Sequence, residues 1–572
     1  MKTNRLRLGA ALLGLLLPTA SFAQHPAIDT AWAYNGKAKV VEAAHAVVVS
    51  GSPIASEIGR QILERGGNAV DAAVAVGFAL AVVHPEAGNI GGGGFLMLRH
   101  AAGDVHALDF RETAPLAATR DMYIGPDGKT DKRSQIGHLA AGVPGSVAGL
   151  REAHRRFGKL PWKELLEPAI RLARDGFVID EYRHKSITND TALLRRFPAS
   201  VRQFLPGGVP PAVGSTLRQA DLARTLSAIS EHGAEGFYQG WVADSIVGEM
   251  KRGGGLISLA DLTAYRAIWR EAVHFKYRDY TLYSMPPVSS GGATLGLILH
   301  LMEGFKPTPS FGSAQLLHLE AESMRRAFLE RNRSLGDPAF VSNPVDRMLS
   351  KEFADKLRKG IDPRHATPTS KVVAELREGS STTHYSIVDS AGNAVSVTTT
   401  INSLYGNGVT VSGAGFLLND EMDDFSTAPG KPDQFGAVTG ENNAIAPGKR
   451  MLSSMTPTIV LDPQGKLFLV LGTPGGTTII TQVYHVISNV IDHRMTLADA
   501  VAAPRMHHQA LPDTLRLEKE PSFLAATIAE LRGLGHDLKF VNAMGDVQAI
   551  IRAGAGWQGV SDQRRGGGGA GY

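Results

Sequence analysis

The stretch Ser380-Ser381-Thr382-Thr383-His384-Tyr385-Ser386 lies well inside a chain of 572 residues. The alternating pattern from Thr382 to Val388 predicts a β-strand. A threonine hydroxyl is a weak nucleophile and needs a base, which a free α-amine on the same residue can provide. We therefore interpret Thr382 as a nucleophile that becomes a new N-terminus when the bond after Ser381 is cut. Taken alone, a threonine in such a run is usually only a strand former.

The segments around this strand alternate between helical and extended patterns. Asp389–Asn393 predicts a turn and Ala394–Ile401 a second strand, which together indicate a hairpin. Residues 161–354 have a mostly helical pattern, and the glycine-rich tail 566–569 is expected to be flexible. Further strands are expected at 46–49, 95–98, 458–461 and 467–471, helices at 69–83, 477–490 and 497–502, and a solvated linker at 356–379. Helices on both sides of stacked sheets account for this order, so the chain is predicted to be an α/β protein with αββα layers.

Four consecutive glycines, Gly91–Gly94, stand between the expected helix 69–83 and the strand at 95–98. They match neither a dinucleotide-binding fingerprint nor a phosphate-binding P-loop. We expect instead that the backbone passes very close to a neighbouring segment here, because glycine has no side chain to obstruct it.

The first 23 residues have the pattern of a secretory signal. Lys2, Arg5 and Arg7 precede an apolar run from Leu8 to Leu17, and small residues stand before a cleavage position after Ala23. The run is too short to span a bilayer. We therefore expect export to the periplasm or the medium, with no membrane span once the signal is removed.

The composition excludes several classes of function. The chain has 59 Lys and Arg against 55 Asp and Glu, and the signal holds three of the basic residues, which leaves a nearly neutral mature protein. That balance gives no reason to expect nucleic-acid binding. There is no cysteine, hence no disulfide and no thiolate metal site.

Several motifs, in order along the mature chain, resemble those of the γ-glutamyltranspeptidase family of N-terminal-nucleophile hydrolases. They are Asp109-Phe110-Arg111-Glu112, Gly142-Val143-Pro144-Gly145-Ser146, Thr382-Thr383-His384-Tyr385-Ser386, Met422-Asp423-Asp424-Phe425, Ser453-Ser454-Met455, Pro474-Gly475-Gly476 and Ala503-Pro504-Arg505. The resemblance implies a four-layer αββα sandwich built jointly by a large subunit, 24–381, and a small subunit, 382–572. These two chains would form a heterodimer after the precursor cuts itself between Ser381 and Thr382.

The resemblance also implies the catalytic residues. Thr382 would attack the γ-carbonyl of a glutamyl amide and form an acyl-enzyme. Thr400 matches the family's second threonine, whose hydroxyl can bond the nucleophile across the hairpin. Gly475 and Gly476 match the pair whose backbone N–H groups form the oxyanion hole, a task that suits residues without a shielding side chain.

Binding of the glutamyl group is implied to need both ends of an amino acid. Arg111 would hold the α-carboxylate with its planar guanidinium, assisted by the hydroxyl groups of Ser453 and Ser454. The α-ammonium would be bound by the residues Asn402, Glu421 and Asp424. The implied substrates are glutathione and other γ-glutamyl compounds, and the implied acceptors are water, amino acids and dipeptides.

Two positions depart from some relatives. Glu421 stands where some bacterial members have glutamine, which adds negative charge near the ammonium. The segment 429–450 matches the lid over the glutamyl pocket, and Phe435 stands where some relatives have a tyrosine that bonds the equivalent of Asn402. A phenyl ring cannot form that bond, so looser gating is expected.

No metal or other cofactor is expected. The pair His507-His508 does not fit a metal-binding helix motif and is interpreted as structural. Two other functions stay open: a related acylase that takes glutaryl side chains, which would not need Asp424, and an unprocessed binding protein without catalysis.

Overall fold

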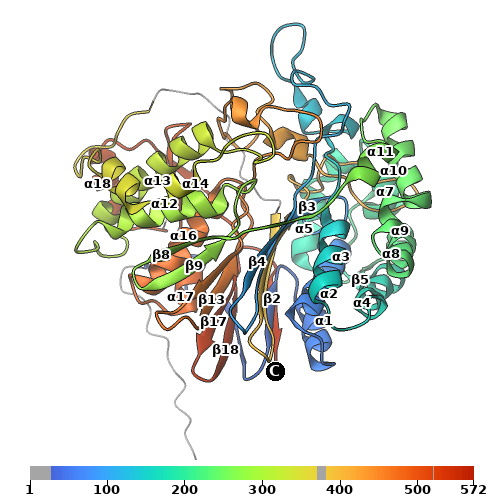
Figure 1. Ribbon diagram of the computed structural model, residues 1–572, viewed down its shortest axis with the longest axis horizontal. Coiled ribbons are helices and arrows are strands. Elements are labelled where there is room, and N and C mark those ends of the chain that lie inside the picture. Colours follow the sequence, from blue (N-terminus) through green and yellow to red (C-terminus); the bar gives the residue numbers. More distant parts are fainter. Residues whose placement is uncertain (1–27, 370–381, 520) are drawn as a thin grey trace, which may run out of the picture.

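The computed structural model describes residues 28–369, 382–519 and 521–572, so the expected signal segment and Ser381 lie outside the described residues. Two seven-stranded sheets stack face to face at the centre of the molecule (Figure 1). One sheet has the spatial order β1 (Lys39–Ala43), β18 (Gly556–Ser561), β17 (Gln548–Ala553), β13 (Leu467–Gly472), β12 (Thr458–Leu461), β9 (Tyr280–Ser284) and β8 (Val273–Tyr277). The other has the order β19 (Gly568–Gly571), β2 (Val47–Ser50), β10 (Thr382–Val388), β11 (Ala394–Thr400), β3 (Gly93–Arg99), β4 (Val105–Phe110) and β7 (Ile268–Arg270).

Helices cover the outer face of each sheet, which confirms the αββα layering (Figure 1). The sheet that contains β10 is covered by α1 (Pro53–Glu64), α2 (Ala69–Val83), α3 (Ser146–Phe157), α4 (Trp162–Asp175) and, further out, α5 (Glu181–Asn189), α6 (Thr191–Leu194), α7 (Pro198–Phe204), α8 (Ala220–His232), α9 (Glu235–Tyr238), α10 (Gly240–Gly253) and α11 (Leu259–Ala264). The opposite side carries α12 (Gly291–Glu303), α13 (Ala314–Ser334), α14 (Val345–Met348), α15 (Lys351–Arg358), α16 (Thr478–Ile491), α17 (Leu497–Ala502) and α18 (Ala525–Gly533). A third apolar cluster, which includes Val49, Phe95 and Val470, fills the space between the sheets.

Both sheets mix strands from before and after Thr382. In the sheet that contains β10, the hairpin β10–β11 lies between β2 and β3. In the other sheet, β12 pairs with β9 and β18 pairs with β1. If the chain were cut between Ser381 and Thr382, each sheet would still contain strands of both pieces. The two pieces could therefore not separate without unfolding both sheets.

Local sequence explains the elements near the hairpin. Asn68 caps α2, accepting hydrogen bonds from the backbone of Val70 and Asp71, and every residue of this helix except Gly77 is buried. The close approach expected at the glycine run is confirmed. A Cβ atom on Gly92 would lie 1.9 Å from the carbonyl oxygen of Thr400, so only glycine fits beside the end of β11.

The structure corrects two expectations. Strands β8 and β9 lie in a region expected to be mostly helical, and they form the edge of a sheet. The glycine-rich tail is not free, because β19 pairs along β2 from Gly568↔Ser50 to Gly571↔Val47. Both glycines pack tightly: a Cβ atom on Gly571 would lie 2.6 Å from that of Ala43. The small residues that indicated flexibility instead permit close packing.

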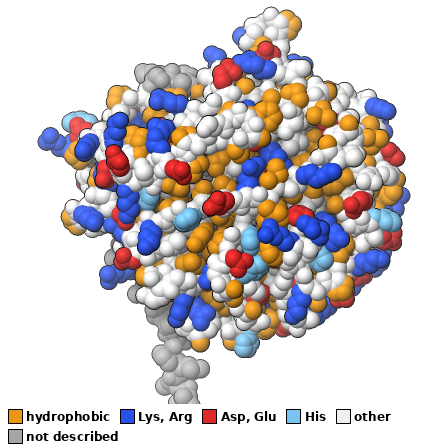
Figure 2. All heavy atoms as spheres, viewed as in Figure 1, with side chains coloured by type: hydrophobic (Ala, Val, Ile, Leu, Met, Phe, Trp, Pro, Cys, Tyr) orange, Lys and Arg blue, Asp and Glu red, His pale blue; other side chains and the backbone are white. Residues whose placement is uncertain are grey.

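Basic and acidic side chains occur together on the face shown in Figure 2, as the balanced composition predicts. Among the described residues, no helix has both the length and the apolar character needed to cross a membrane. Two small sheets, β5 (Phe177–Val178) with β6 (Thr216–Leu217) and β14 (Met506–His507) with β15 (Leu515–Glu518) and β16 (Leu538–Val541), complete the fold.

Candidate active site

The hairpin places two threonine hydroxyl groups opposite each other. In the antiparallel register of β10 and β11, Thr382 faces Thr400, and the two Oγ1 atoms are 3.3 Å apart. The Thr400 Oγ1 also accepts a hydrogen bond of 2.8 Å from the backbone N–H of Asn402. Arg565 donates to the Thr382 carbonyl at 3.2 Å, which fixes the start of the strand.

Strand alternation distinguishes Thr382 from its neighbour Thr383. His384 lies on the same face as Thr382, and a Cβ atom on Gly472 of the other sheet would lie 2.3 Å from its ring. Thr383 points to the opposite face, toward Gly51. A shift of one residue would exchange the two threonines, and seven paired positions between β10 and β11 fix the register.

A narrow pocket, open to solvent on one side, lies at the Thr382 end of the hairpin. It is lined by ten residues named from the sequence: Arg111, Thr382, Thr400, Asn402, Glu421, Asp424, Phe435, Ser453, Ser454 and Gly476. It is also lined by Asp433, Ala437, Thr439 and Asn443 of the expected lid segment, by Met455 of a quoted motif, and by residues that sequence reasoning missed: Arg331, Leu452, Thr477 and Ile479. Strands, loops and helices from both sides of Thr382 thus converge on one cavity.

Arg111 forms the charged end of this pocket. Its side chain is 1% exposed and pairs with Asp424, and its Nη1 lies 2.6 Å from Glu421 Oε2 and 3.4 Å from Glu112 Oε2. Burial lowers the pKa of Arg111, but the surrounding carboxylates more than offset this and raise it. The guanidinium therefore stays charged. Arg111 and Asp424, which were each expected to bind a substrate, bind each other in this structure.

Glu421 is the carboxyl group in this cluster with the strongest reason to be neutral. It is fully buried, and neither of its oxygens has an aligned hydrogen bond among the described residues. Burial raises the pKa of Glu421 well above its ordinary value, against the opposing effect of Arg111. One guanidinium faces three neighbouring carboxyl groups, and this arrangement favours the neutral form of Glu421.

The two serines of the pocket are held by different contacts. Ser453 Oγ accepts from the backbone N–H of Met455 at 3.2 Å, and the Ser453 carbonyl accepts from the hydroxyl group of Ser290 at 2.6 Å. Ser454 Oγ accepts from Arg331 at 2.9 Å. Both serines lie on the pocket wall.

The turn at Gly475 and Gly476 presents unused donors. The φ angles are 141° and 57°, in the region that favours glycine. Within the described part of the chain, neither backbone N–H of this pair has a hydrogen-bond partner. Gly476 lines the pocket, whereas Gly475 lies just behind it, where a Cβ atom would be 2.5 Å from Thr478 Oγ1.

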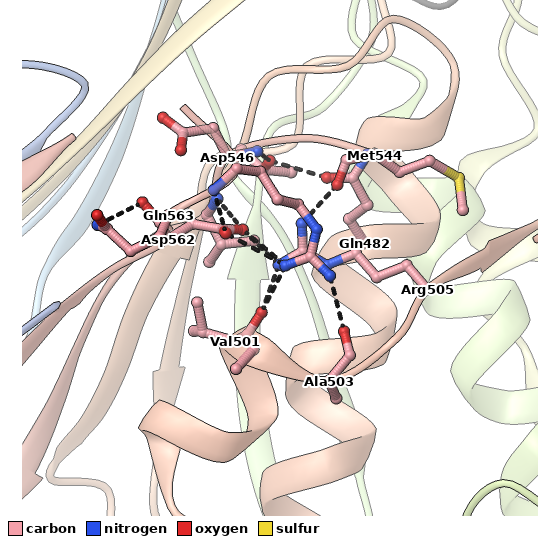
Figure 3. Close-up of polar contacts among 12 residues, drawn as sticks. Gln482, Val501, Ala503, Arg505, Met544, Asp546, Asp562 and Gln563 are labelled. Carbon is pink, nitrogen blue, oxygen red and sulfur yellow. Dashed lines mark hydrogen bonds and ion pairs between the residues drawn. The ribbon is translucent and has the colours of Figure 1, made fainter. Parts of the chain in front are cut away.

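A buried polar network supports this glycine turn, and Figure 3 shows the part of the network around Gln482, Arg505 and Asp562. Gln482 on α16 donates to Thr478 Oγ1 and accepts from Thr473 Oγ1 at 2.9 Å, and Thr473 Oγ1 also accepts from the backbone of Asp546. Nearby, Arg505 lies 2.6 Å from Asp562 and donates to the carbonyls of Met544 and Val501. Through Asp546 and Asp562, the network connects the turn to the C-terminal strands β17 and β18. The position of the turn therefore depends on these strands.

The segment expected to be a lid closes one side of the pocket. Phe435 is 7% exposed, and its carbonyl accepts from Gln509 at 3.3 Å. The neighbouring Gln434 provides a stronger attachment: it contacts Ser403 at 3.1 Å, Asp420 at 3.1 Å and, through its backbone N–H, Asp423 at 3.1 Å. The lid is therefore fastened through a residue that the sequence did not single out.

Residues 55–572 match the model of the gamma-glutamyltranspeptidase family. The chain belongs to this family. It is 44% identical over 517 residues to the "Glutathione hydrolase proenzyme" of Escherichia coli (strain K12), with 89% of each chain covered. It is 40% identical over 468 residues to the "Acylase ACY 1 proenzyme" of Pseudomonas sp. (strain V22), with 80% of this chain and 82% of the relative covered.

The fold agrees with this membership. The cephalosporin acylase from Bacillus halodurans superposes with a TM-score of 0.83 at 27% identity, covering 95% of this chain and 99% of that one. These relatives are named as enzymes, and "proenzyme" in their names implies that they are processed from precursors. The three classes considered from the sequence are thus reduced to two, both of them catalytic.

The histidines set aside as structural lie outside the pocket. His507 bonds Thr481 at 2.9 Å and Gln509 at 2.9 Å, and His508 lies 3.3 Å from Asp513. Among the described residues, one group brings potential metal-binding atoms within 4.8 Å of one another: His100, Asp104 and His106. This group lies on the exposed turn between β3 and β4, and it takes no part in the site.

Proposed function

We propose that this enzyme transfers the γ-glutamyl group of glutathione and related γ-glutamyl amides to water or to amino acid and dipeptide acceptors. One observation carries the proposal: Arg111 and Asp424 lie together in the pocket that contains the Thr382 hydroxyl group. An α-amino acid has its carboxylate and ammonium groups on one carbon atom, so a cation and an anion must stand side by side to bind both. The glutamyl side chain then extends its γ-carbonyl away from this pair and toward the threonine.

In the proposed reaction, Thr382 Oγ1 attacks the γ-carbonyl carbon and its proton passes to the free α-amine of the same residue. The backbone N–H groups at Gly475 and Gly476 stabilise the negative charge on the carbonyl oxygen. The C–N bond then breaks, the leaving amine takes the proton, and a glutamyl ester remains. Water or an acceptor amine attacks the ester, releases the glutamyl group and returns the proton to the threonine hydroxyl.

The same hydroxyl group is proposed to open the bond between Ser381 and Thr382 and so to produce chains 24–381 and 382–572. The shared sheets support a lasting heterodimer, because each chain contributes strands to both sheets. The leader at residues 1–23 supports export to the periplasm or the medium.

The proposal is tested on purified protein with γ-glutamyl-p-nitroanilide, with and without a dipeptide acceptor. We expect nitroaniline release, faster release with the acceptor, and a small chain whose first residue is Thr382. A single full-length chain that releases no nitroaniline would contradict the proposal.

A glutaryl acylase is the second candidate, because a relative 40% identical is named an acylase. A glutaryl group equals a γ-glutamyl group without the ammonium. The ion-paired Asp424 favours the glutamyl substrate, because a buried carboxylate has no function beside an acyl group without positive charge. Comparison of γ-glutamyl- and glutaryl-p-nitroanilide under the same conditions decides between the two.

Replacing Glu421 with glutamine is expected to change kcat/KM at neutral pH by no more than about threefold, because a protonated carboxyl group and an amide have similar charge and shape. The pH dependence should differ. A raised pKa in the folded state means that the stability from this group is present at low pH and is lost as the pH rises through that pKa. The Tm of the unaltered protein, measured from acid to alkaline pH, should therefore fall below that of E421Q at the alkaline end. Parallel Tm curves would show that Glu421 is already ionised.

Replacing Phe435 with tyrosine is expected to tighten the lid. Asn402 uses its Nδ2 to bond the Asp420 carbonyl at 3.0 Å, and its Oδ1 has no hydrogen-bond partner among the described residues. A tyrosine hydroxyl group can donate to that oxygen, at about 1 kcal/mol for a neutral bond. We expect slower turnover and a changed ratio of transfer to hydrolysis, measured with and without acceptor. If neither changes, the lid is governed by Gln434 alone.

A further inference from the structure

Arg331 is a buried cation on the wall of the pocket, and it has no carboxylate within ion-pair distance among the described residues. It lies on α13 with 3% of its surface exposed. Other arginines of the same helix are paired: Arg325 lies 3.1 Å and Arg326 2.6 Å from Glu322. Burial without such a partner lowers the pKa of Arg331 to about 10, which still leaves it charged at neutral pH. Asp433 and Asp424 of the same pocket oppose this effect of burial, but only from beyond ion-pair distance, so the positive charge on the pocket wall can still take a direct anionic partner from a ligand.

The guanidinium also determines how the nearby hydroxyl groups are oriented. It donates to Ser290 Oγ at 2.8 Å, to Asn332 Oδ1 at 2.7 Å and to Ser454 Oγ at 2.9 Å. Arginine has no acceptor, so Ser454 Oγ must receive this bond and its own hydrogen must point elsewhere. In the described part of the chain this hydrogen has no acceptor, and Ser454 faces the cavity. Ser290 is oriented in the same way: its hydroxyl group accepts from Arg331 and donates to the Ser453 carbonyl at 2.6 Å.

We propose that Arg331 is a specificity-determining residue: it fixes Ser454 as a hydrogen-bond donor and supplies the free positive charge that selects acyl groups ending in a carboxylate. This inference rests on the proposed function. It divides the recognition of an acyl group between two cations. Arg111 contacts Asp424 and Glu421 directly, whereas Arg331 has no carboxyl group in ion-pair contact among the described residues.

Three anilides that differ by one group each test the proposal. γ-Glutamyl-p-nitroanilide carries both the carboxylate and the ammonium, glutaryl-p-nitroanilide only the carboxylate, and 4-aminobutyryl-p-nitroanilide only the ammonium. In R331M, kcat/KM for the first two should fall about tenfold to hundredfold, mainly through KM, which corresponds to the loss of a charged hydrogen bond. The value for the 4-aminobutyryl compound, measured at high enzyme concentration, should stay within about twofold of the unaltered enzyme.

Matched variants separate this role from a structural one. R326M alters a paired arginine on the same helix and should leave the selectivity among the three anilides unchanged. S454A should lose the same selectivity, and the double variant R331M/S454A should lose less than the product of the two single effects. R331K keeps the charge but not the planar guanidinium fork whose separate nitrogens bond Ser290, Asn332 and Ser454, so we expect a smaller loss than in R331M.

Equal losses on all three anilides, or no loss, would overturn the inference. If R331M does not fold, R331K decides: carboxylate selectivity equal to that of the unaltered enzyme would show that the fork to Ser454 has no role. The proposed function has a separate point of failure. If the unaltered enzyme cleaves none of the anilides, that function is wrong, whereas an active enzyme with unchanged selectivity in R331M contradicts this inference alone.

Discussion

Replacing Thr382 with alanine is expected to give a folded, full-length chain without acyl-transfer activity. The side chain is 6% exposed and small, so its loss leaves the packing between the sheets intact, but it removes the only hydroxyl group that faces Thr400 across the hairpin among the described residues. Both the cleavage before residue 382 and the later attack on a substrate need that oxygen. We expect activity to fall by about 10⁴-fold or more, as when other nucleophiles are removed. Gel electrophoresis shows the uncut chain, and anilide hydrolysis measures the activity.

Thr383 provides the matched control for this experiment. It has the same chemical type and adjoins Thr382, but it faces Gly51 on the helix-covered side of the sheet. T383V should be cut and active, and T382S, which keeps a hydroxyl group, should be cut more slowly. If T382A is cut at the same bond, the nucleophile lies elsewhere. If T383V also stays uncut, the register inferred for β10 does not describe the precursor.

The catalytic hairpin could be predicted from the sequence because its signals are local. Alternation from Thr382 to Val388, a turn and a second β-branched run predict two paired strands, and the structure confirms them with Thr382 opposite Thr400. Helix α2 has the predicted bounds Ala69–Val83. In each case neighbouring residues alone impose the conformation.

The features that could not be predicted depend on contacts between distant segments. Arg331 lies in an amphipathic helix, where an arginine usually faces solvent, and only the docking of α13 against residues 453–454 places it on the pocket. Gln434 becomes an attachment point only when the lid meets Ser403 and Asp420. Three of the four residues of β19 are glycines, which have little strand propensity, and close packing against β2 determines their conformation.

The charges of the pocket show the same limit. Sequence reasoning gave Arg111 and Asp424 separate tasks at opposite ends of an amino acid. In the structure they bind each other, and Glu421 and Glu112 complete a buried cluster around one guanidinium. Substrate binding must therefore exchange this internal ion pair for two pairs with the ligand. The exchange is favourable only for a ligand that brings both charges.

Replacing Arg111 with methionine is accordingly expected to abolish γ-glutamyl transfer while leaving self-cleavage intact. The direct effect is the loss of contacts to the α-carboxylate, each worth about 1.5–3 kcal/mol. The indirect effect arises because the charge of Arg111 opposes the burial that raises the pKa of Asp424 and Glu112. Loss of Arg111 raises the pKa of both carboxyl groups further, which favours their neutral forms and weakens Asp424 as an anionic partner for an ammonium group. Recognition of both ends fails, and we expect kcat/KM to fall by about 10³-fold or more.

Self-cleavage does not need this recognition, because the bond before Thr382 is delivered by the chain itself and not bound as a free amino acid. N-terminal sequencing of the small chain of R111M should therefore still give Thr382. R111K, which keeps a charge but not the planar fork, should retain more activity than R111M. R224M serves as the control: Arg224 lies 2.7 Å from Asp221 on an exposed part of α8 outside the pocket, and its loss should leave kcat/KM nearly unchanged. An uncut R111M protein would mean that the precursor needs the buried charge cluster in order to fold. Protonation of the remaining carboxyl groups would then not compensate for the missing cation.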